Sequence, residues 1–198
     1  THFLMKAGHA KKGVIAIKVV NDKLAKKLQE ATEGYQNIEV VTVPDAYPMG
    51  WERVLIRELF KKEYDRFPGE IGIIVNNATT AIYLSEALRD KKPITHRIVT
   101  ISGEGVKNPE NVYVPIGTSV DYIIEKIGGY TENVNEMFVL GGGPMMGKSI
   151  ANDTFVVTTY SNSITVLPKV VEEELPCLRC GLCVEHCPAK IQPVQIMN

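Results

Sequence analysis

The pattern of apolar and polar residues in the first part of the chain predicts alternating strands and helices. Residues 14–20 are rich in β-branched side chains, which favour a strand, and the capping pair Asn21-Asp22 follows them. Apolar residues then recur at helical spacing over residues 23–32, and residues 38–43 return to a strand pattern. This order predicts a β-α-β unit.

The same alternation continues beyond this unit. A helix is expected over residues 51–60, with an apolar face formed by Val54, Leu55, Leu59 and Phe60. Residues 71–75 are continuously apolar, as in a parallel strand covered on both faces, and a further helix follows the turn at residues 76–80. We therefore expect residues 1–94 to form a Rossmann-like α/β layer domain.

The pattern changes near residue 95, where short alternating segments replace the longer helices. Residues 97–101 and 111–115 are joined by turn-rich sequence and predict an antiparallel pair of strands. The other expected elements are a short helix opening at residues 117–121 and ending at Gly128-Gly129, a strand over residues 137–140, and a hairpin of residues 155–159 with 164–167. Two strands, a helix and further strands indicate a small β-grasp domain over residues 95–168.

All four cysteines of the chain lie close together near its C-terminus. Cys177, Cys180, Cys183 and Cys187 form the pattern C-x2-C-x2-C-x3-C-P, whose first three thiolates are spaced to grip three corners of one cubane. A disulfide scaffold would spread its cysteines, so we expect a reducing compartment and a [4Fe-4S] cluster. Residues 169–198 are therefore predicted to be a ferredoxin-like iron–sulfur segment.

The same cysteines leave other interpretations open. In two-cluster ferredoxins the fourth cysteine serves the other cluster, and a single cluster held by all four is the alternative. Zinc is a competing metal, although its sites usually pair two short knuckles across a longer excursion. A thiol oxidoreductase using Cys177 and Cys180 would not need four clustered cysteines.

Composition excludes some classes of partner. The formal net charge of −1 and the sequence pI near 6.4 give no electrostatic basis for binding nucleic acid. No stretch reaches the eighteen or so apolar residues that a membrane span requires. The N-terminus lacks an initiator Met and the order of a signal peptide, so we expect this chain to be a piece of a longer protein.

Several motifs, taken in order along the chain, resemble the RnfC subunit of the Rnf ferredoxin:NAD oxidoreductase, which is similar to the flavin- and NADH-binding subunit of respiratory complex I. The resemblance is carried by residues 47–52, 74–80, 97–100 and 142–147, and by the cysteine run. It implies a flavin/NADH domain, a soluble-ligand-binding β-grasp domain and a segment carrying two [4Fe-4S] clusters. The family's Gly-rich flavin and NADH loop has no equivalent in this chain.

The resemblance also assigns roles to individual residues. Asn76, Asn77 and Thr80 would contact FMN, and Glu52 would lie near the nucleotide, although Trp51 replaces a residue that is small in the family. Side-chain amides beside a helix N-terminus suit a phosphate, but the two asparagines also fit a simple helix cap. The Gly141-Gly142-Gly143 run lacks the helix of a dinucleotide fingerprint and is better explained as a tight turn.

The resulting functional hypothesis is an electron-transfer subunit that passes electrons between flavin or NADH and [4Fe-4S] clusters. Its partners would be other electron-transfer subunits or a ferredoxin-like protein, in the cytoplasm or peripheral at the cytoplasmic face of a membrane complex. One alternative is a soluble RnfC-like electron donor to an amino-acid reductase such as proline reductase. An alternative of another class is a non-catalytic ligand- or partner-binding module with a structural zinc site.

Overall fold

The computed structural model describes residues 1–150, 153–169, 175–187 and 189–197. Contacts divide the chain into two compact units. Thr1–Ser85 and Leu175–Asn198 belong to the first unit, and Glu86–Glu174 form the second. Helices and strands are present in both, as expected for a mixed α/β chain.

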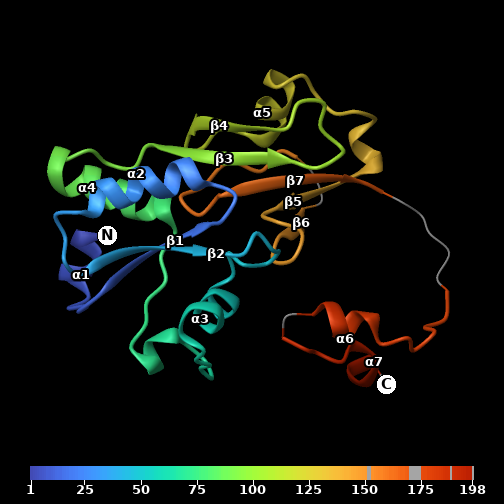
Figure 1. Ribbon diagram of the computed structural model, residues 1–198. Helices are drawn as coiled ribbons and strands as arrows, with labels where there is room; N and C mark the ends of the chain where they lie inside the picture. The colour runs from blue at the N-terminus through green and yellow to red at the C-terminus, as the bar shows by residue number, and fades with distance from the viewer. Residues whose placement is uncertain (151–152, 170–174, 188, 198) are drawn as a thin grey trace. The chain divides into compact units, whose positions relative to one another are not determined.

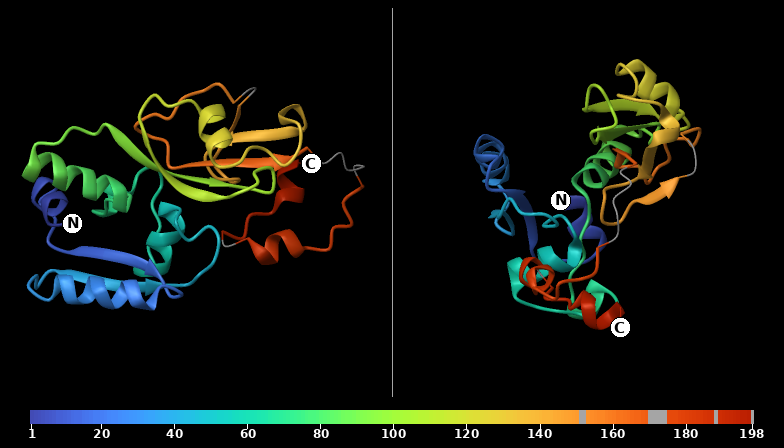
Figure 2. Two further views of the ribbon diagram at one scale, coloured as in Figure 1. Left: turned by 90° about the horizontal axis from the view of Figure 1, so that it is seen from above. Right: turned by 90° about the vertical axis from the view of Figure 1, so that its right-hand side faces the viewer.

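The first unit contains the predicted β-α-β unit. Strands β1 (Gly13–Lys18) and β2 (Ile38–Val43) pair in parallel, with Gly13 opposite Ile38. The connecting helix α2 (Asp22–Thr32) contacts β2 and buries Ala25 (Figure 1 and Figure 2). A short helix, α1 (His2–Ala7), precedes β1 and buries Met5.

Two further helices follow, and their buried faces differ from expectation. Helix α3 (Glu52–Phe60) occupies the predicted range, but its buried residue is Ile56, with 1% of its surface exposed, whereas the predicted face residue Phe60 is exposed. The longer α4 (Ala78–Asp90) buries Tyr83. The helix positions are therefore confirmed, and the apolar face assigned to α3 is partly wrong.

The strand predicted over residues 71–75 is also wrong. Pro68–Ile71 form a 3-10 helix, η1, and Gly72 follows it in the left-handed conformation with φ of 72°. The turn therefore falls inside the predicted strand. Residues 73–77 form neither helix nor strand, and among the described residues β1 and β2 pair only with each other.

The second unit is built on a five-stranded sheet with the order β4-β3-β7-β5-β6. Its strands are β3 (His96–Ser102), β4 (Glu110–Pro115), β5 (Met137–Gly141), β6 (Lys148–Ile150) and β7 (Ser163–Pro168). The predicted antiparallel pair of β3 and β4 is confirmed, with Ile98 opposite Tyr113. A one-turn 3-10 helix, η2 (Val134–Glu136), leads into β5.

Helix α5 (Val120–Lys126) covers one face of this sheet. Its buried positions follow helical spacing, and they pack with buried residues of β3, β5 and β7. The residues of this core are Val99, Ile101, Val106, Val120, Ile123, Ile124, Ile127, Met137, Val139, Val157, Ile164 and Val166. All of them lie in the second unit.

The hairpin predicted for residues 155–159 and 164–167 is wrong. Strand β7 lies between β3, to which it is parallel, and β5, to which it is antiparallel, so both of its edges are occupied (Figure 1). Residues 155–157 pair instead with the segment before α5. The Val157 N–H donates to the Thr118 carbonyl at 2.8 Å, and the Val120 N–H donates to the Phe155 carbonyl at 3.0 Å.

Helices long and apolar enough to cross a membrane are not found in the part of the chain that the structure describes.

Candidate functional site

The cysteine segment places its four thiols on a short, tightly turned stretch. All four cysteines are free; Cys177, Cys180 and Cys183 are exposed and Cys187 is half-buried. Helix α6 (Leu182–His186) separates the last two, and α7 (Pro193–Met197) follows. Arg179 and Gly181 adopt positive φ angles of 54° and 80°, which turn the backbone between the first three cysteines.

Backbone N–H groups in this segment donate to the sulfur atoms of Cys177 and Cys187. The Arg179 N–H donates to the Cys177 Sγ at 3.4 Å. Hydrogen bonds from the backbone N–H groups of Ile191 and Ala189 hold the pKa of the Cys187 thiol below its ordinary value of 9.0, and the charge of Lys190 acts in the same direction. These contacts therefore shift Cys187 toward the thiolate, the form in which cysteine binds metals.

The described side chains of the cysteine segment are not grouped in metal-binding geometry. Among the described residues, no group of three or more His, Cys, Asp or Glu side chains is placed to hold a metal ion. The donor set nevertheless fits an iron–sulfur cluster chemically, because thiolates that accept backbone N–H bonds are the ligands such clusters use. The assignment of Cys177, Cys180, Cys183 and Cys187 as ligands stays a prediction.

The turn at residues 76–80 lies at the N-terminus of α4. Asn77 Oδ1 accepts hydrogen bonds from the Thr79 backbone N–H at 2.9 Å and the Thr79 hydroxyl at 2.6 Å, so Asn77 caps the helix. The side chains of Asn76, Asn77 and Thr80 are exposed. An exposed, polar helix N-terminus suits a phosphate group. Phosphate binding at this turn is compatible with the capping role of Asn77.

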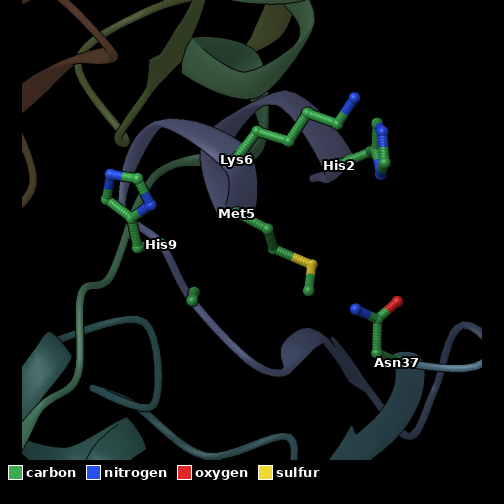
Figure 3. Close-up of a pocket in the computed structure, with 6 residues that line it drawn as sticks. His2, Met5, Lys6, His9 and Asn37 are labelled. Carbon is green, nitrogen blue, oxygen red and sulfur yellow. The ribbon is translucent and has the colours of Figure 1, made fainter.

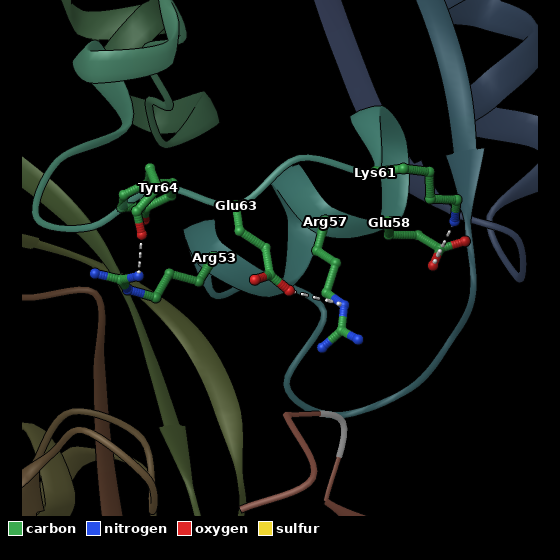
Figure 4. Close-up of polar contacts among 6 residues, drawn as sticks. All are labelled: Arg53, Arg57, Glu58, Lys61, Glu63 and Tyr64. Carbon is green, nitrogen blue, oxygen red and sulfur yellow. Dashed lines mark hydrogen bonds and ion pairs between the residues drawn. The ribbon is translucent and has the colours of Figure 1, made fainter.

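Glu52 begins α3 and is engaged within the first unit. The Tyr64 hydroxyl donates to Glu52 Oε1 at 2.9 Å. The neighbouring Arg53 donates to the carbonyl of Tyr64 at 2.8 Å (Figure 4). It also donates to the carbonyl of Asp65 at 2.6 Å. The structure thus joins Asn76, Asn77 and Thr80 in one turn and gives Glu52 a separate set of partners.

Tyr64, Arg53 and Glu70 were not predicted as site residues. The Glu70 carboxylate accepts N–H groups of Asp65 and Phe67, at 3.1 and 3.0 Å, and so fixes the loop that carries Tyr64. These contacts join residues three to twelve positions apart without a repeating spacing. A motif-based interpretation of the sequence therefore has no signal for them.

Two shallow hollows lie elsewhere. One, of about 430 Å³, is lined by His2, Met5, Lys6, His9, Ala10 and Asn37, with the Met5 side chain extending toward Asn37 (Figure 3). The other, of about 330 Å³, is lined by Gly141, Gly142, Gly143, Phe155, Thr158, Tyr160, Ser161, Asn162, Ser163 and Ile164. Neither hollow includes a residue predicted to bind a cofactor.

The glycine run of the second hollow is a tight turn, as predicted. Gly142 has a φ of 127°, and a Cβ there would lie 2.8 Å from the Gly147 Cα. The Gly147 N–H donates to the Gly143 carbonyl at 2.7 Å, and the Thr165 hydroxyl donates to the Gly142 carbonyl at 2.8 Å. The positive φ and the close approach of backbone to backbone explain the glycine at position 142.

Comparison with protein families matches both units separately. Residues 1–86 match the family model of the Nuo51 FMN-binding domain. Residues 98–149 match the SLBB domain. The two matches follow the order expected from the sequence.

Comparison with curated proteins finds the C subunits of ion-translocating complexes. The C subunit of the ion-translocating oxidoreductase complex of Rhodobacter capsulatus is 36% identical over 168 residues, which are 82% of this chain and 32% of that protein. The C subunit of the proton-translocating ferredoxin:NAD(+) oxidoreductase complex of Clostridium ljungdahlii is 33% identical over 195 residues, 96% of this chain and 42% of that protein. The corresponding protein of Yersinia enterocolitica is 33% identical over 175 residues, 85% of this chain and 25% of that protein.

These relatives confirm the resemblance predicted from the sequence. The chain spans between a quarter and less than half of the length of each of these three relatives.

Proposed function

On the premise that this chain is a homologue of RnfC proteins, we propose that it is part of an electron-transfer subunit of an RnfC-like NADH/ferredoxin oxidoreductase. The observation that carries the proposal is the similarity to the Clostridium ljungdahlii protein, which extends over 96% of the chain at 33% identity. A similarity of that extent includes both units and is hard to explain by one shared domain alone.

The proposed architecture has three parts. Residues 1–94 would be a Rossmann-like FMN/NADH domain, residues 95–168 a β-grasp (SLBB) domain, and residues 169–198 a ferredoxin-like segment. The parallel β1-α2-β2 unit supports the first assignment. The sheet with β7 between β3 and β5, covered by α5, supports the second.

In this proposal Cys177, Cys180 and Cys183 hold one [4Fe-4S] cluster, and Cys187 serves a second cluster. When bound, such clusters accept and release single electrons. The protein's part is to present thiolates and to donate N–H groups to sulfur, as the Arg179 N–H does to Cys177. Hydrogen bonds of this kind stabilise negative charge on sulfur and would therefore raise the reduction potential of a bound cluster.

FMN is the proposed flavin, with NAD(H) as the exchange partner. Asn76, Asn77 and Thr80 would contact the flavin at the N-terminus of α4, and Glu52 would lie beside the nucleotide. The exposed polar turn at residues 76–80 and the match of residues 1–86 to the Nuo51 FMN-binding domain support this assignment. The helix N-terminus would stabilise a phosphate, and the amides would orient the ligand by hydrogen bonds.

The proposed partners are other subunits of an oxidoreductase complex or a ferredoxin-like protein. The proposed location is the cytoplasm, peripheral on the cytoplasmic face of a membrane complex. The names of the relatives, which describe subunits of ion- or proton-translocating complexes, support both proposals. Nucleic acid is not a proposed partner, since the net charge is −1.

The test is chemical analysis of the full-length protein that contains this chain, purified without oxygen. We expect stoichiometric iron and acid-labile sulfide, broad visible absorption and bound FMN. Zinc in place of iron at these sulfurs would refute the cluster assignment. A protein with clusters but no flavin would refute the FMN assignment and leave an electron relay.

Two cysteine variants separate one cluster from two. In a two-cluster protein, Cys177→Ser and Cys187→Ser should each alter a different paramagnetic signal of the reduced protein. In a single-cluster protein both variants should alter the same signal. Ser keeps the size of Cys but replaces the soft sulfur ligand, so it is a matched substitution.

A further inference from the structure

Tyr64 is a buried polar side chain of the first unit with contacts to two residues at the start of α3. Only 9% of its surface is exposed, and its hydroxyl donates to Glu52 Oε1 at 2.9 Å. The Arg53 guanidinium carbon lies 4.3 Å from the centre of the Tyr64 ring. Burial, and then the hydrogen bond to Glu52, raise the pKa of the Tyr64 hydroxyl, so it stays protonated and remains a donor at neutral pH.

The loop behind Tyr64 is fixed from two sides. Arg53 donates to the carbonyls of Tyr64 and Asp65 at 2.8 and 2.6 Å, while the Glu70 carboxylate accepts the N–H groups of Asp65 and Phe67 at 3.1 and 3.0 Å. Arg53 also lies next to Glu52 at the start of α3. The tyrosine hydroxyl is therefore held in place relative to the helix that carries the carboxylate.

This arrangement orients one oxygen of Glu52. A carboxylate can accept about four hydrogen bonds, so the bond from Tyr64 leaves capacity for further donors. Vicinal hydroxyls of a sugar or sugar alcohol are such donors, and acidic side chains commonly bind them in nucleotide sites. We propose that Tyr64 is a positioning residue that fixes the Glu52 carboxylate to accept hydroxyl groups of a bound nucleotide.

The inference rests on the proposed function, which places Glu52 beside the nucleotide. The hydroxyls belong to the ribityl chain if the ligand is FMN and to a ribose if it is NAD(H). The two sources share the same chemistry, and separate binding measurements distinguish them.

The experiment uses the full-length protein with Tyr64→Phe, which keeps the ring under Arg53 and removes only the hydroxyl. We expect the dissociation constant of one nucleotide to rise about five- to tenfold, which is the size of one ordinary net hydrogen bond. A rise for FMN, measured by flavin fluorescence quenching, assigns the ribityl chain, and a rise for NADH assigns a ribose. Tyr122→Phe, at an exposed tyrosine of the second unit, is the matched control and should change neither constant.

A double-mutant cycle tests whether Tyr64 acts through Glu52. Glu52→Gln should weaken the same ligand, and adding Tyr64→Phe should cause little further loss, because the carboxylate it positions is gone. Equal losses from Tyr64→Phe in the presence and absence of Glu52 would show a structural role and overturn the inference. No effect of Glu52→Gln on either ligand would instead refute the placement of Glu52 in the proposed function.

A second variant tests the same inference if Tyr64→Phe does not fold. Glu52→Asp retains the charge but shortens the side chain by one methylene, so it draws the carboxylate away from the Tyr64 hydroxyl. We expect Glu52→Asp to weaken the same ligand by a similar factor. Wild-type affinity in this variant would contradict the requirement for a fixed carboxylate.

Discussion

Gly103 lies in the turn after β3, where the backbone leaves no space for a side chain. Its φ is 106°, and a Cβ would lie 1.9 Å from the Val166 carbonyl oxygen. Both the left-handed backbone and the contact with another backbone oppose substitution. We expect Gly103→Ala to lower the free energy of unfolding of the second unit by about 3 kcal/mol or more.

Chemical denaturation followed by circular dichroism measures this loss. Gly143→Ala is the control, since a Cβ at Gly143 meets no atom within 4 Å. The control should lie within about 0.5 kcal/mol of wild type. Similar losses for both variants would mean that the close approach at Gly103 does not constrain the fold.

Glu70 makes the loop of residues 65–67 dependent on pH. Hydrogen bonds from the backbone N–H groups of Phe67, Asp65 and Arg66 lower the pKa of the Glu70 carboxyl from its ordinary value of 4.5. A carboxyl with a lowered pKa in the folded state stabilises the fold above its unfolded pKa, and this stabilisation is lost as the pH falls through the folded value. The protection factors of the amides at residues 65–67, measured by NMR and corrected for the intrinsic exchange rate at each pH, should therefore fall on acidification below pH 4.5.

The variant Glu70→Gln should remove that dependence. Its protection factors at residues 65–67 should already be low at neutral pH, with little further change on acidification. Glu33→Gln, at an exposed glutamate outside this loop, should behave as wild type. An unchanged pH profile in Glu70→Gln would contradict the role of the carboxylate.

At the scale of residues, sequence reasoning succeeds where spacing carries the signal. The cysteine run can be recognised in the sequence because four identical residues are separated by short fixed intervals. Asn77 can be predicted to cap a helix because helix N-termini favour such side chains, and the structure confirms the capping hydrogen bond. The Tyr64–Glu52 bond joins residues twelve positions apart through a loop whose path depends on Glu70, so the sequence gives no sign of it.

In strand β3, the alternation of buried and exposed side chains determines how much a substitution lowers the free energy of unfolding. Ile101 is 1% exposed and packs in the core under α5, whereas Ile98 of the same strand is 45% exposed. We expect Ile101→Ala to cost about 3 kcal/mol of unfolding free energy, through lost burial and the cavity left behind. Ile98→Ala, the matched control, should cost less than about 1 kcal/mol. Urea denaturation of both variants checks the difference, and equal costs would contradict the assignment of the buried face.

Elements are predicted well where the pattern is local and poorly where pairing is distant. The ranges of α2, β2, α3, β3 and β4 follow from periodicity and flanking turns. The predicted hairpin fails because β7 pairs in parallel with β3, more than sixty residues earlier, and with β5 on its other edge. The predicted strand at residues 71–75 fails because an apolar run does not reveal the left-handed turn at Gly72.

At the scale of the whole molecule, burial is distributed unevenly. The second unit has a core of its own. None of the side chains described between Leu175 and Ile196 is fully buried; Leu178, for example, is 89% exposed. The helices α6 and α7 have five residues each, which is too short for stability without tertiary packing. A local core therefore does not stabilise the described part of this segment.

If metal binding orders this segment, chelation should act on one part of the chain only. Binding of a metal to ligands that are unstructured without it contributes directly to folding. In the loaded full-length protein, removal of iron with a chelator under reducing conditions should accelerate amide exchange across residues 175–197. The amides of Val99 and Val166, in the core of the second unit, should keep their protection. Hydrogen exchange followed by mass spectrometry resolves the two regions. Loss of protection in both would mean that the second unit depends on the cluster segment, and no change in either would mean that the segment is ordered by contacts other than metal.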